Sequence, residues 1–290
     1  MKTWDELDIS DNFIFQNVMK DSQICKEFLE KLLGINIRKI NYVELEKVFD
    51  FGIETKGIRL DVYVEDEKQT VYDIEMQTTN TLYDSLPNRT RYYQSMLVAN
   101  LIKKGQDYQD LKKTFVIFIC TFDPFKENLK MYTFKNLCVE SRNLELGDGS
   151  TIIFLNAKGD NGKPHKDIKN LLNFIKGESA KGSFTKKIAL KVDEVKRNDR
   201  LKVGYMSWYA EEMRIRRIAR MEALAEGKAE GKAEGKAEGR AEGEASKTFE
   251  IIKNLLSAET PIKFIIKATG WTKEQLLEFA KKENLKVVDD

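Results

Sequence analysis

The segment that decides the fold is IRLDVYVEDEKQTVYDIEMQ, residues 58–77. Two alternating stretches flank a polar turn at 66–69, which is typical of a β-hairpin. If the hairpin is symmetric about residue 68, Asp61 lies directly opposite Glu75. Residues opposite one another in an antiparallel pair point to the same face, with Cβ atoms about 5 Å apart. This register therefore places two carboxylates side by side.

The same register also satisfies the hydrophobic pattern of the two strands. It places Arg59 opposite Gln77 and Tyr63 opposite Asp73. Side chains alternate between the two faces of a strand, so a one-residue shift would reverse every one of them. In this register the apolar residues share one face, as a core requires: Ile58, Leu60, Val62, Val64, Ile74 and Met76.

The paired acids predict a cation site. Adjacent carboxylates repel one another, and Mg²⁺ is bound by one or two carboxylates together with waters and a substrate phosphate. Gln77 projects to the same face as Glu75, where its amide could position a water or a phosphate oxygen. The spacing equally fits two surface acids with Arg59 and Arg91 as ion-pair partners. Asp73 shares the face of Glu75, and the sequence leaves open which of these two acids would be the ligand.

The composition excludes several other kinds of chemistry. The 290 residues include one histidine, His165, which rules out a two-histidine zinc site, and the cysteines form no CxxC. No nucleophile motif accompanies that histidine, and the sequence contains no GxxxxGK[ST] and no strand-borne GxGxxG. The net charge of +2 argues neither for nor against a polyanionic partner. What remains is carboxylates with a hard cation, or no catalysis.

The sequence carries no sign of membrane insertion or secretion. It has no run of about 18 apolar residues, and its acidic N-terminus lacks the apolar region of a signal peptide. Three single cysteines (Cys25, Cys120 and Cys138) among apolar neighbours indicate buried thiols in a reducing compartment. We therefore predict a cytoplasmic protein with no membrane partner.

Periodicity along the first two hundred residues predicts a mixed α/β (α+β) fold, with a central mixed sheet flanked by helices. The continuously apolar run at 115–122 indicates a strand buried on both faces. A helix over 84–104 carries Pro87 in its first turns, and the helical stretch 11–33 has Ser22 as a cap and ends at Gly34. The other expected elements are strands at 37–49, 57–65, 70–77, near 131–139 and 151–155, and helices near 167–176, 184–197 and 200–224.

The composition changes abruptly at residue 222, where Ala-Glu-Gly-basic repeats every four residues. Each glycine costs a helix about 1 kcal/mol relative to alanine, and neighbours at i,i+4 carry like charge. We therefore favour a flexible charged linker over a marginal helix. Residues 247–284 follow as a small amphipathic helical module, in which Thr272 and Gln275 form a capping box.

Several motifs resemble those of the Rpn-type recombination-promoting nucleases, also described as PD-(D/E)XK family transposases. The resemblance covers nearly the whole chain, and its motifs occur in the family's order. The late Glu-Gly-basic repeats also look like that family's tail. The motifs are SDNFIFQNVM at 10–19, DVYV at 61–64, IEMQ at 74–77, NRTRYYQSML at 88–97, KKGQDY at 103–108 and TGWTKEQL at 269–276.

The resemblance implies roles for particular residues. Asp61 and Glu75 would bind the metal, Mg²⁺ or another divalent cation. Gln77 stands where most PD-(D/E)XK nucleases have lysine, so Arg91 or Lys103 would have to supply the missing cation.

A third metal ligand is also implied at the start of the first helix. Asp11 matches an acid that the wider superfamily often uses in this way. Asp11 would equally serve as the N-cap of that helix.

The resemblance further implies a restriction-endonuclease-like sheet and a Mg²⁺-dependent endodeoxyribonuclease that hydrolyses phosphodiester bonds in DNA. Its role would lie in DNA recombination, mobile elements or defence against foreign DNA. We divide the chain into a nuclease domain (1–200), a helix and repeat linker (201–246) and a C-terminal helical module (247–290). The Gly/Ala repeat and the amphipathic tail suggest a homodimer through the C-terminal helices.

Two alternatives remain. A catalytically inactive module that keeps the fold would bind DNA or protein without cutting. A DDE-type transposase would need three acids at long spacing, against which the gap of 14 residues between Asp61 and Glu75 argues.

Overall fold

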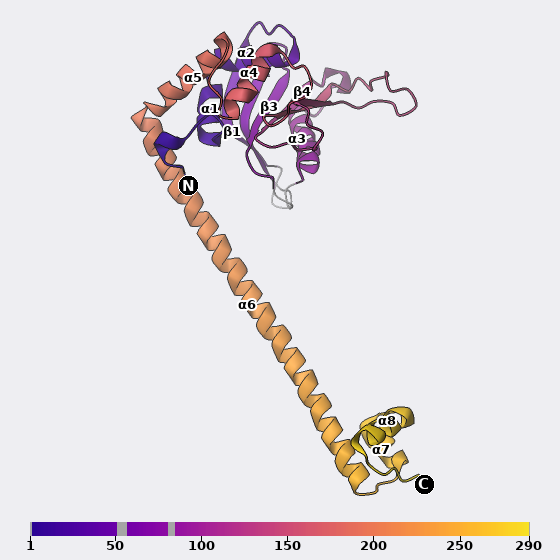
Figure 1. Ribbon diagram of the computed structural model, residues 1–290. Coiled ribbons are helices and arrows are strands. Elements are labelled where there is room, and N and C mark those ends of the chain that lie inside the picture. The colour runs from indigo at the N-terminus through magenta and orange to yellow at the C-terminus, as the bar shows by residue number, and fades with distance from the viewer. Residues whose placement is uncertain (1, 51–56, 81–84, 290) are drawn as a thin grey trace. The chain divides into compact units, whose positions relative to one another are not determined.

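The computed structural model describes residues 2–50, 57–80 and 85–289. A six-stranded sheet in the order β1-β2-β3-β4-β6-β5 lies at its centre (Figure 1). β1, β2 and β3 are antiparallel, β3, β4 and β6 are parallel, and β5 pairs antiparallel with β6. The predicted mixed sheet is therefore confirmed. Its strands are β1 (Ile40–Phe49), β2 (Ile58–Asp66), β3 (Val71–Gln77), β4 (Thr114–Cys120), β5 (Met131–Phe134) and β6 (Ser150–Asn156).

Helices cover both faces of the sheet (Figure 1). Four of them pack against one another on one face: α1 (Asn12–Met19), α2 (Ser22–Leu33), α4 (Lys166–Ile175) and α5 (Ser183–Lys196). The opposite face is covered by α3 (Leu86–Leu101), which connects the parallel strands β3 and β4. Short 3₁₀ turns lie at Trp4–Glu6 and Tyr108–Asp110.

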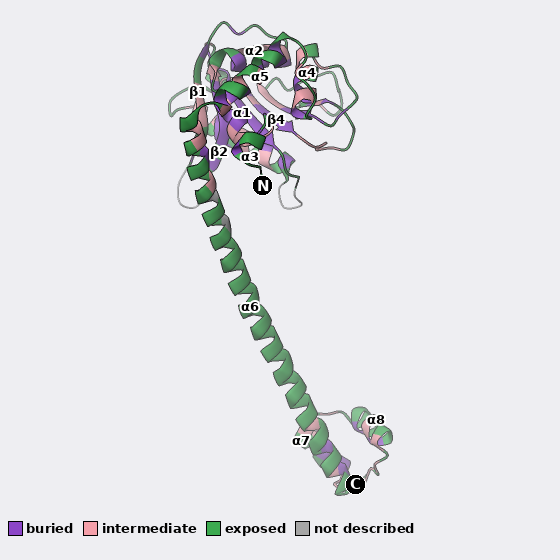
Figure 2. Ribbon diagram, turned by 60° about the vertical axis from the view of Figure 1, so that its left-hand side comes forward, coloured by how far each residue is buried: buried purple, intermediate pink, exposed green. Residues whose placement is uncertain are grey.

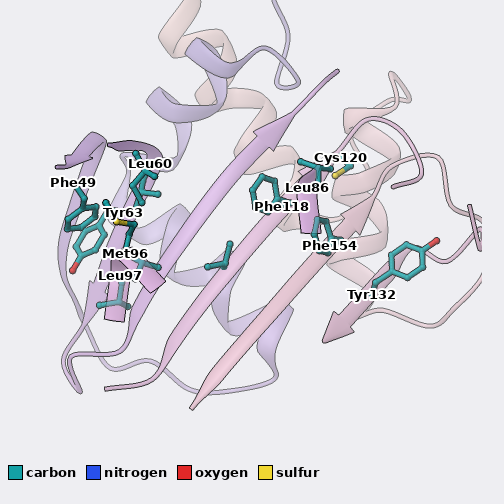
Figure 3. Packing of buried hydrophobic residues seen from close by; sticks show 13 residues of the cluster. Phe49, Leu60, Tyr63, Leu86, Met96, Leu97, Phe118, Cys120, Tyr132 and Phe154 are labelled. Atoms are coloured by element: carbon teal, nitrogen blue, oxygen red, sulfur yellow. The ribbon is translucent and has the colours of Figure 1, made fainter. Parts of the chain in front are cut away.

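The apolar strand β4 requires helices on both faces of the sheet, because it is central and hydrophobic on both sides. It pairs with β3 on one side and β6 on the other, and six of its seven residues are buried, as its continuous hydrophobicity predicts. The α3 face carries an aromatic core in which the rings of Phe118 and Phe154 stack 5.5 Å apart and those of Phe49 and Tyr63 meet at 5.9 Å (Figure 3). The hairpin that bears the acids is therefore enclosed between two helical layers.

The helix boundaries differ from the prediction at two places. The helical stretch 11–33 is two helices, and the N-cap of the second is Asp21, whose carboxylate accepts hydrogen bonds from two backbone N–H groups, rather than Ser22. Gly34 ends that helix with φ +66°, as expected. The helix expected over 84–104 is shorter, Leu86–Leu101; its predicted first residue, 84, lies outside the described residues.

The chain forms two compact units, Met1–Ser207 and Trp208–Asp290. The repeat is helical, which corrects the preference for a flexible linker: it lies within α6 (Asp199–Ser257). Alanine, glutamate and lysine are strong helix formers, and they outweigh the recurring glycines in a helix that is anchored beyond both ends of the repeat. Residues 221–247 are all exposed (Figure 2).

The end of α6 packs with α7 (Ile262–Thr269) and α8 (Lys273–Glu283). The predicted capping box is confirmed, because Thr272 Oγ1 accepts from the Gln275 N–H and Gln275 Oε1 accepts from the Thr272 N–H. The core of this module consists of Ile252, Leu256, Ile262, Ile265, Leu276 and Ala280. No helix in the described ranges has an apolar stretch long enough to cross a bilayer.

Candidate active site

β2 and β3 pair in the predicted register and then separate. The recorded pairs run from Glu65–Val71 to Val62–Ile74, in the register symmetric about residue 68. Beyond Val62 and Ile74, β2 continues alongside β1 while β3 continues alongside β4. The two strands therefore form a fork, and Asp61 and Glu75 are the first residues past its closed end.

The two carboxylates bridge the fork. The Asp61 N–H donates to Glu75 Oε1 at 2.8 Å, and the Met76 N–H donates to Asp61 Oδ2 at 3.2 Å. Each acid thus bonds to the backbone of the opposite strand where the β-ladder has ended. Asp61 is 8% exposed and Glu75 5% exposed, so the interpretation as solvated surface acids is wrong.

Helix α1 holds the Asp61 carboxylate from the other side. Asn12 Nδ2 and Gln16 Nε2 donate to Asp61 Oδ1 at 3.0 and 3.1 Å. Asp61 therefore accepts three hydrogen bonds, which orient it firmly. Neither amide was predicted from the sequence. The signal that could have indicated them is their i,i+4 spacing, which places both on one face of the helix that begins directly after Asp11.

Asp73 is a further buried acid beside the fork. It is fully buried, and its carboxyl adjoins that of Glu75, with which it shares a hydrogen bond when one of the two acids is protonated; no other donor reaches its oxygens within the described residues. Asp66, another buried acid of the hairpin, is satisfied by the N–H groups of Lys68 and Thr70 and by the Tyr72 hydroxyl. Because two adjacent buried carboxylates repel one another, Asp73 has no evident role in stabilising the fold.

Burial and mutual repulsion disfavour the charged forms of these acids. Loss of hydration, followed by the charge of Asp61, raises the pKa of Glu75 to about 8. Burial, followed by the charge of Glu75, raises the pKa of Asp73 well above its usual value. Burial also raises the pKa of Asp61, although its donors on α1 and β3 favour the charged form. Such perturbed carboxyls gather at functional sites.

Gln77 lies farther along β3 and is held by an arginine from α3. Arg89 Nη2 donates to Gln77 Oε1 at 2.6 Å, and Gln77 Nε2 donates to the Thr79 carbonyl at 2.7 Å. The Arg89 guanidinium carbon lies 4.8 Å from the centre of the Phe118 ring. A cation therefore stands beside Gln77, the strand position at which the resemblance noted in the sequence implies a lysine.

Arg89, rather than Arg91 or Lys103, is the cation in contact with Gln77. Its charge counters the raised pKa values of Asp73 and Glu75. Arg91 and Lys103 are both exposed. The reason is helical geometry: at 3.6 residues per turn, two residues of α3 only two positions apart point in nearly opposite directions.

Asp11 lies at the N-cap position of α1 and is engaged elsewhere. One of its oxygens accepts from the Asp8 N–H at 2.8 Å and pairs with Lys2 Nζ, also at 2.8 Å. Among the residues that the structure describes, no three His, Cys, Asp or Glu side chains are gathered closely enough to hold a metal ion. The structure brings Asp61 and Glu75 together, with Gln77 two residues farther along β3, while Asp11 stands one residue before the Asn12 that contacts Asp61.

The donor set at the fork fits a divalent cation. Mg²⁺ takes one or two protein carboxylates and completes its shell with water and phosphate oxygens. Asp61 and Glu75 supply two such groups, and the buried carboxyl of Asp73 beside Glu75 adds acidity that a dication would counter. The residues present are thus compatible with a metal-dependent reaction.

Comparison with known proteins agrees with this site. A family model described as PD-(D/E)XK nuclease family transposase matches residues 12–200, a segment that contains the whole sheet, the fork and helices α1 to α5. Neither the comparison with curated proteins nor that with solved structures found a match. Proteins of the matching family share a nuclease fold, process DNA and generally use divalent cations. The chain belongs to the PD-(D/E)XK nuclease family transposases.

Proposed function

We propose that this protein is a Mg²⁺-dependent DNA endonuclease that hydrolyses phosphodiester bonds. The observation that supports it most directly is the fork between β2 and β3, where Asp61 and Glu75 are buried side by side. In keeping with the resemblance noted above, its role would lie in DNA recombination, mobile elements or defence against foreign DNA.

In this proposal Asp61 and Glu75 hold the cation, while Asn12 and Gln16 keep Asp61 in position. A bound divalent cation lowers the pKa of a water molecule and neutralises charge on the scissile phosphate. Gln77 Oε1 already accepts from Arg89, and its second lone pair can accept from the attacking water and orient it.

Arg89 is the residue proposed to meet the phosphate. A guanidinium carries five donors in a planar fork, so it can hold Gln77 and still bind a phosphate oxygen. Lysine has no such fork. We therefore expect Arg89→Lys to lose most of the activity that Arg89→Gln loses.

Nicking of a supercoiled plasmid by the full-length protein tests the proposal. With Mg²⁺ we expect nicking that EDTA abolishes and that Asp61→Ala eliminates. Gln16→Leu, which removes one support of Asp61, should slow nicking about 10- to 100-fold. Equal nicking by wild type and Asp61→Ala would show that the assigned site is wrong.

Two further variants complete that experiment. Glu127→Gln changes an exposed acid on a loop and serves as the matched control, with no change in rate expected. Asp11→Asn tests the proposed third ligand: a loss as large as that of Asp61→Ala would place Asp11 on the metal. An unchanged rate would leave it in the structural role of a partner of Lys2 and of the Asp8 N–H.

A catalytically inactive DNA- or protein-binding module is the second candidate. It is favoured by Gln77, which can neither carry a positive charge nor take a proton at the lysine position. The same plasmid assay separates the two, because this candidate predicts binding without nicking at any Mg²⁺ concentration.

A further inference from the structure

A groove of about 540 Å³ opens at the carboxyl ends of the parallel strands. Thr78, Thr121 and Ala157 line it, and each directly follows the last residue of β3, β4 or β6. In sheets with parallel strands, ligands bind in the crevice outside the carboxyl ends. The groove therefore lies at the edge of the sheet where such sites are found.

Two residues that line the groove stand next to residues of the fork in the sequence. Thr78 follows Gln77 and stands three residues after Glu75, which at about 3.3 Å per residue is roughly 10 Å along the strand. Asp11 also lines the groove, and the next residue, Asn12, donates to Asp61. A chain that lies in this groove would therefore pass close to the paired acids.

Two lysines give the groove an excess of positive charge. Lys158 follows Ala157, and Lys176 is the C-cap of α4; both are exposed and line the groove. Neither has an ion-pair partner among the interactions of the described chain. The third lysine at the groove, Lys2, is already neutralised by Asp8 and Asp11, to which it bonds at 2.7 and 2.8 Å.

We propose that this groove binds the phosphate backbone of the DNA next to the scissile bond, with Lys158 and Lys176 as its phosphate contacts. The inference rests on the proposed nuclease function and adds where the substrate lies. DNA carries one charge per about 3.4 Å of axis on each strand. The roughly 10 Å along the strand between Glu75 and Thr78 therefore places the groove within a few phosphates of the metal-binding acids.

A purely structural role predicts something different for these lysines. A lysine at a helix C-terminus stabilises the helix through its dipole by roughly 0.3–1 kcal/mol, and an exposed lysine in a loop is usually only solvated. Both roles would leave DNA binding untouched. Phosphate contacts, in contrast, appear in the salt dependence of binding, because each one releases counterions.

The test measures binding of the full-length protein to a fluorescein-labelled DNA duplex in EDTA, so that the DNA is not cut. Fluorescence anisotropy over about 50–200 mM KCl yields the slope of log K against log salt. Replacing Lys158 and Lys176 together with alanine should reduce the magnitude of this slope by about 1.8, that is, about 0.9 per lost phosphate contact.

A second groove supplies the matched control. It lies at the amino ends of β4 and β6, where Thr114 and Ser150 line it, and it contains Arg91 and Lys112. The double variant Arg91→Ala/Lys112→Ala removes the same charge from the far edge of the sheet. We expect its slope to equal that of the wild type.

Each outcome decides a separate claim. An unchanged slope for the Lys158/Lys176 variant, or an equal loss in the control, overturns the groove assignment while wild-type nicking keeps the proposed function. A wild type that binds no duplex also overturns the groove assignment, and one that in addition nicks no plasmid with Mg²⁺ refutes the proposed function as well. Lys158→Gln/Lys176→Gln retains long polar side chains without the charge, and should repeat the result if the alanine variant folds poorly by circular dichroism.

Discussion

Glu75→Gln should make the metal-free protein more stable at alkaline pH. In the folded chain the pKa of Glu75 is raised from the ordinary 4.5 to about 8, first by burial and then by the charge of Asp61. Folding therefore favours the protonated acid. Its contribution to stability is complete below about pH 4.5 and is lost as the pH rises through about 8. Glutamine stays neutral throughout and can still accept the Asp61 N–H.

The magnitude follows from the size of the shift. A group that is protonated only when folded lowers the free energy of unfolding by about 1.4 kcal/mol for each pH unit. The rise of the Glu75 pKa from 4.5 to about 8 then corresponds to about 5 kcal/mol at most. Asp73 lies beside Glu75, and the pKa of each acid depends on the charge of the other. We therefore expect the free energy of unfolding of Glu75→Gln to exceed that of the wild type by roughly 2–5 kcal/mol at pH 8.5. At pH 5 the two should agree within about 1 kcal/mol.

Urea denaturation in EDTA at pH 5, 6.5 and 8.5 measures this difference through the midpoint and slope of each transition. The chain has two units, so the signal must come from the first alone. Trp4, which packs on Phe13 with ring centres 5.9 Å apart, reports on that unit. All variants would therefore carry Trp208→Phe and Trp271→Phe.

A wild-type stability that is flat or increases from pH 5 to 8.5 would refute the reasoning. A Glu75→Gln variant less stable than the wild type at pH 8.5 would do the same. Glu127→Gln removes an exposed acid and should change stability by less than about 0.5 kcal/mol at every pH.

Three further predictions concern the metal, the repeat and the tail. Mg²⁺ or Mn²⁺ should bind more tightly at pH 8.5 than at 6.5, because the pKa values of Asp61 and Glu75 are raised and both acids must lose their protons to bind the metal. Titration calorimetry should detect this proton release, and equal affinities at the two pH values would contradict the prediction. Gly235→Ala should stabilise α6 by up to about 1 kcal/mol, seen as higher helicity on heating, because a Cβ there meets nothing within 4 Å; lower helicity would contradict a helical repeat. Ile265→Ala should destabilise the C-terminal module by about 2–5 kcal/mol, seen as faster proteolysis of the tail with nicking unchanged.

Local patterns were enough to predict the hairpin and its register. Alternation with a period of two aligns one strand with the other, and a shift by a single residue would expose the apolar face. The turn is specified by Asp66, whose carboxylate bonds to the N–H groups of Lys68 and Thr70. The apolar run of β4 similarly predicted a strand buried on both faces.

Local sequence patterns did not predict the features that depend on how separate helices and strands pack against one another. The choice of Arg89 over Arg91 depends on which side of α3 faces the sheet, and the polar sequence of that helix does not reveal it. The amides of Asn12 and Gln16 became relevant only because α1 packs against β2. The prediction of a flexible linker was wrong because it considered the destabilising effect of the glycines alone, and not the helical segments on either side that anchor the repeat.

The sequence by itself determined that Asp61 and Glu75 are neighbours, because strand alternation and turn chemistry act over a few residues. Only the tertiary structure decided that they are buried in a fork. That depends on β2 following β1 and β3 following β4 beyond Val62 and Ile74, and on helical layers that exclude water from both faces. Burial and charge repulsion are properties of the assembled layers, and they turn an ordinary pair of acids into carboxyls suited to a dication.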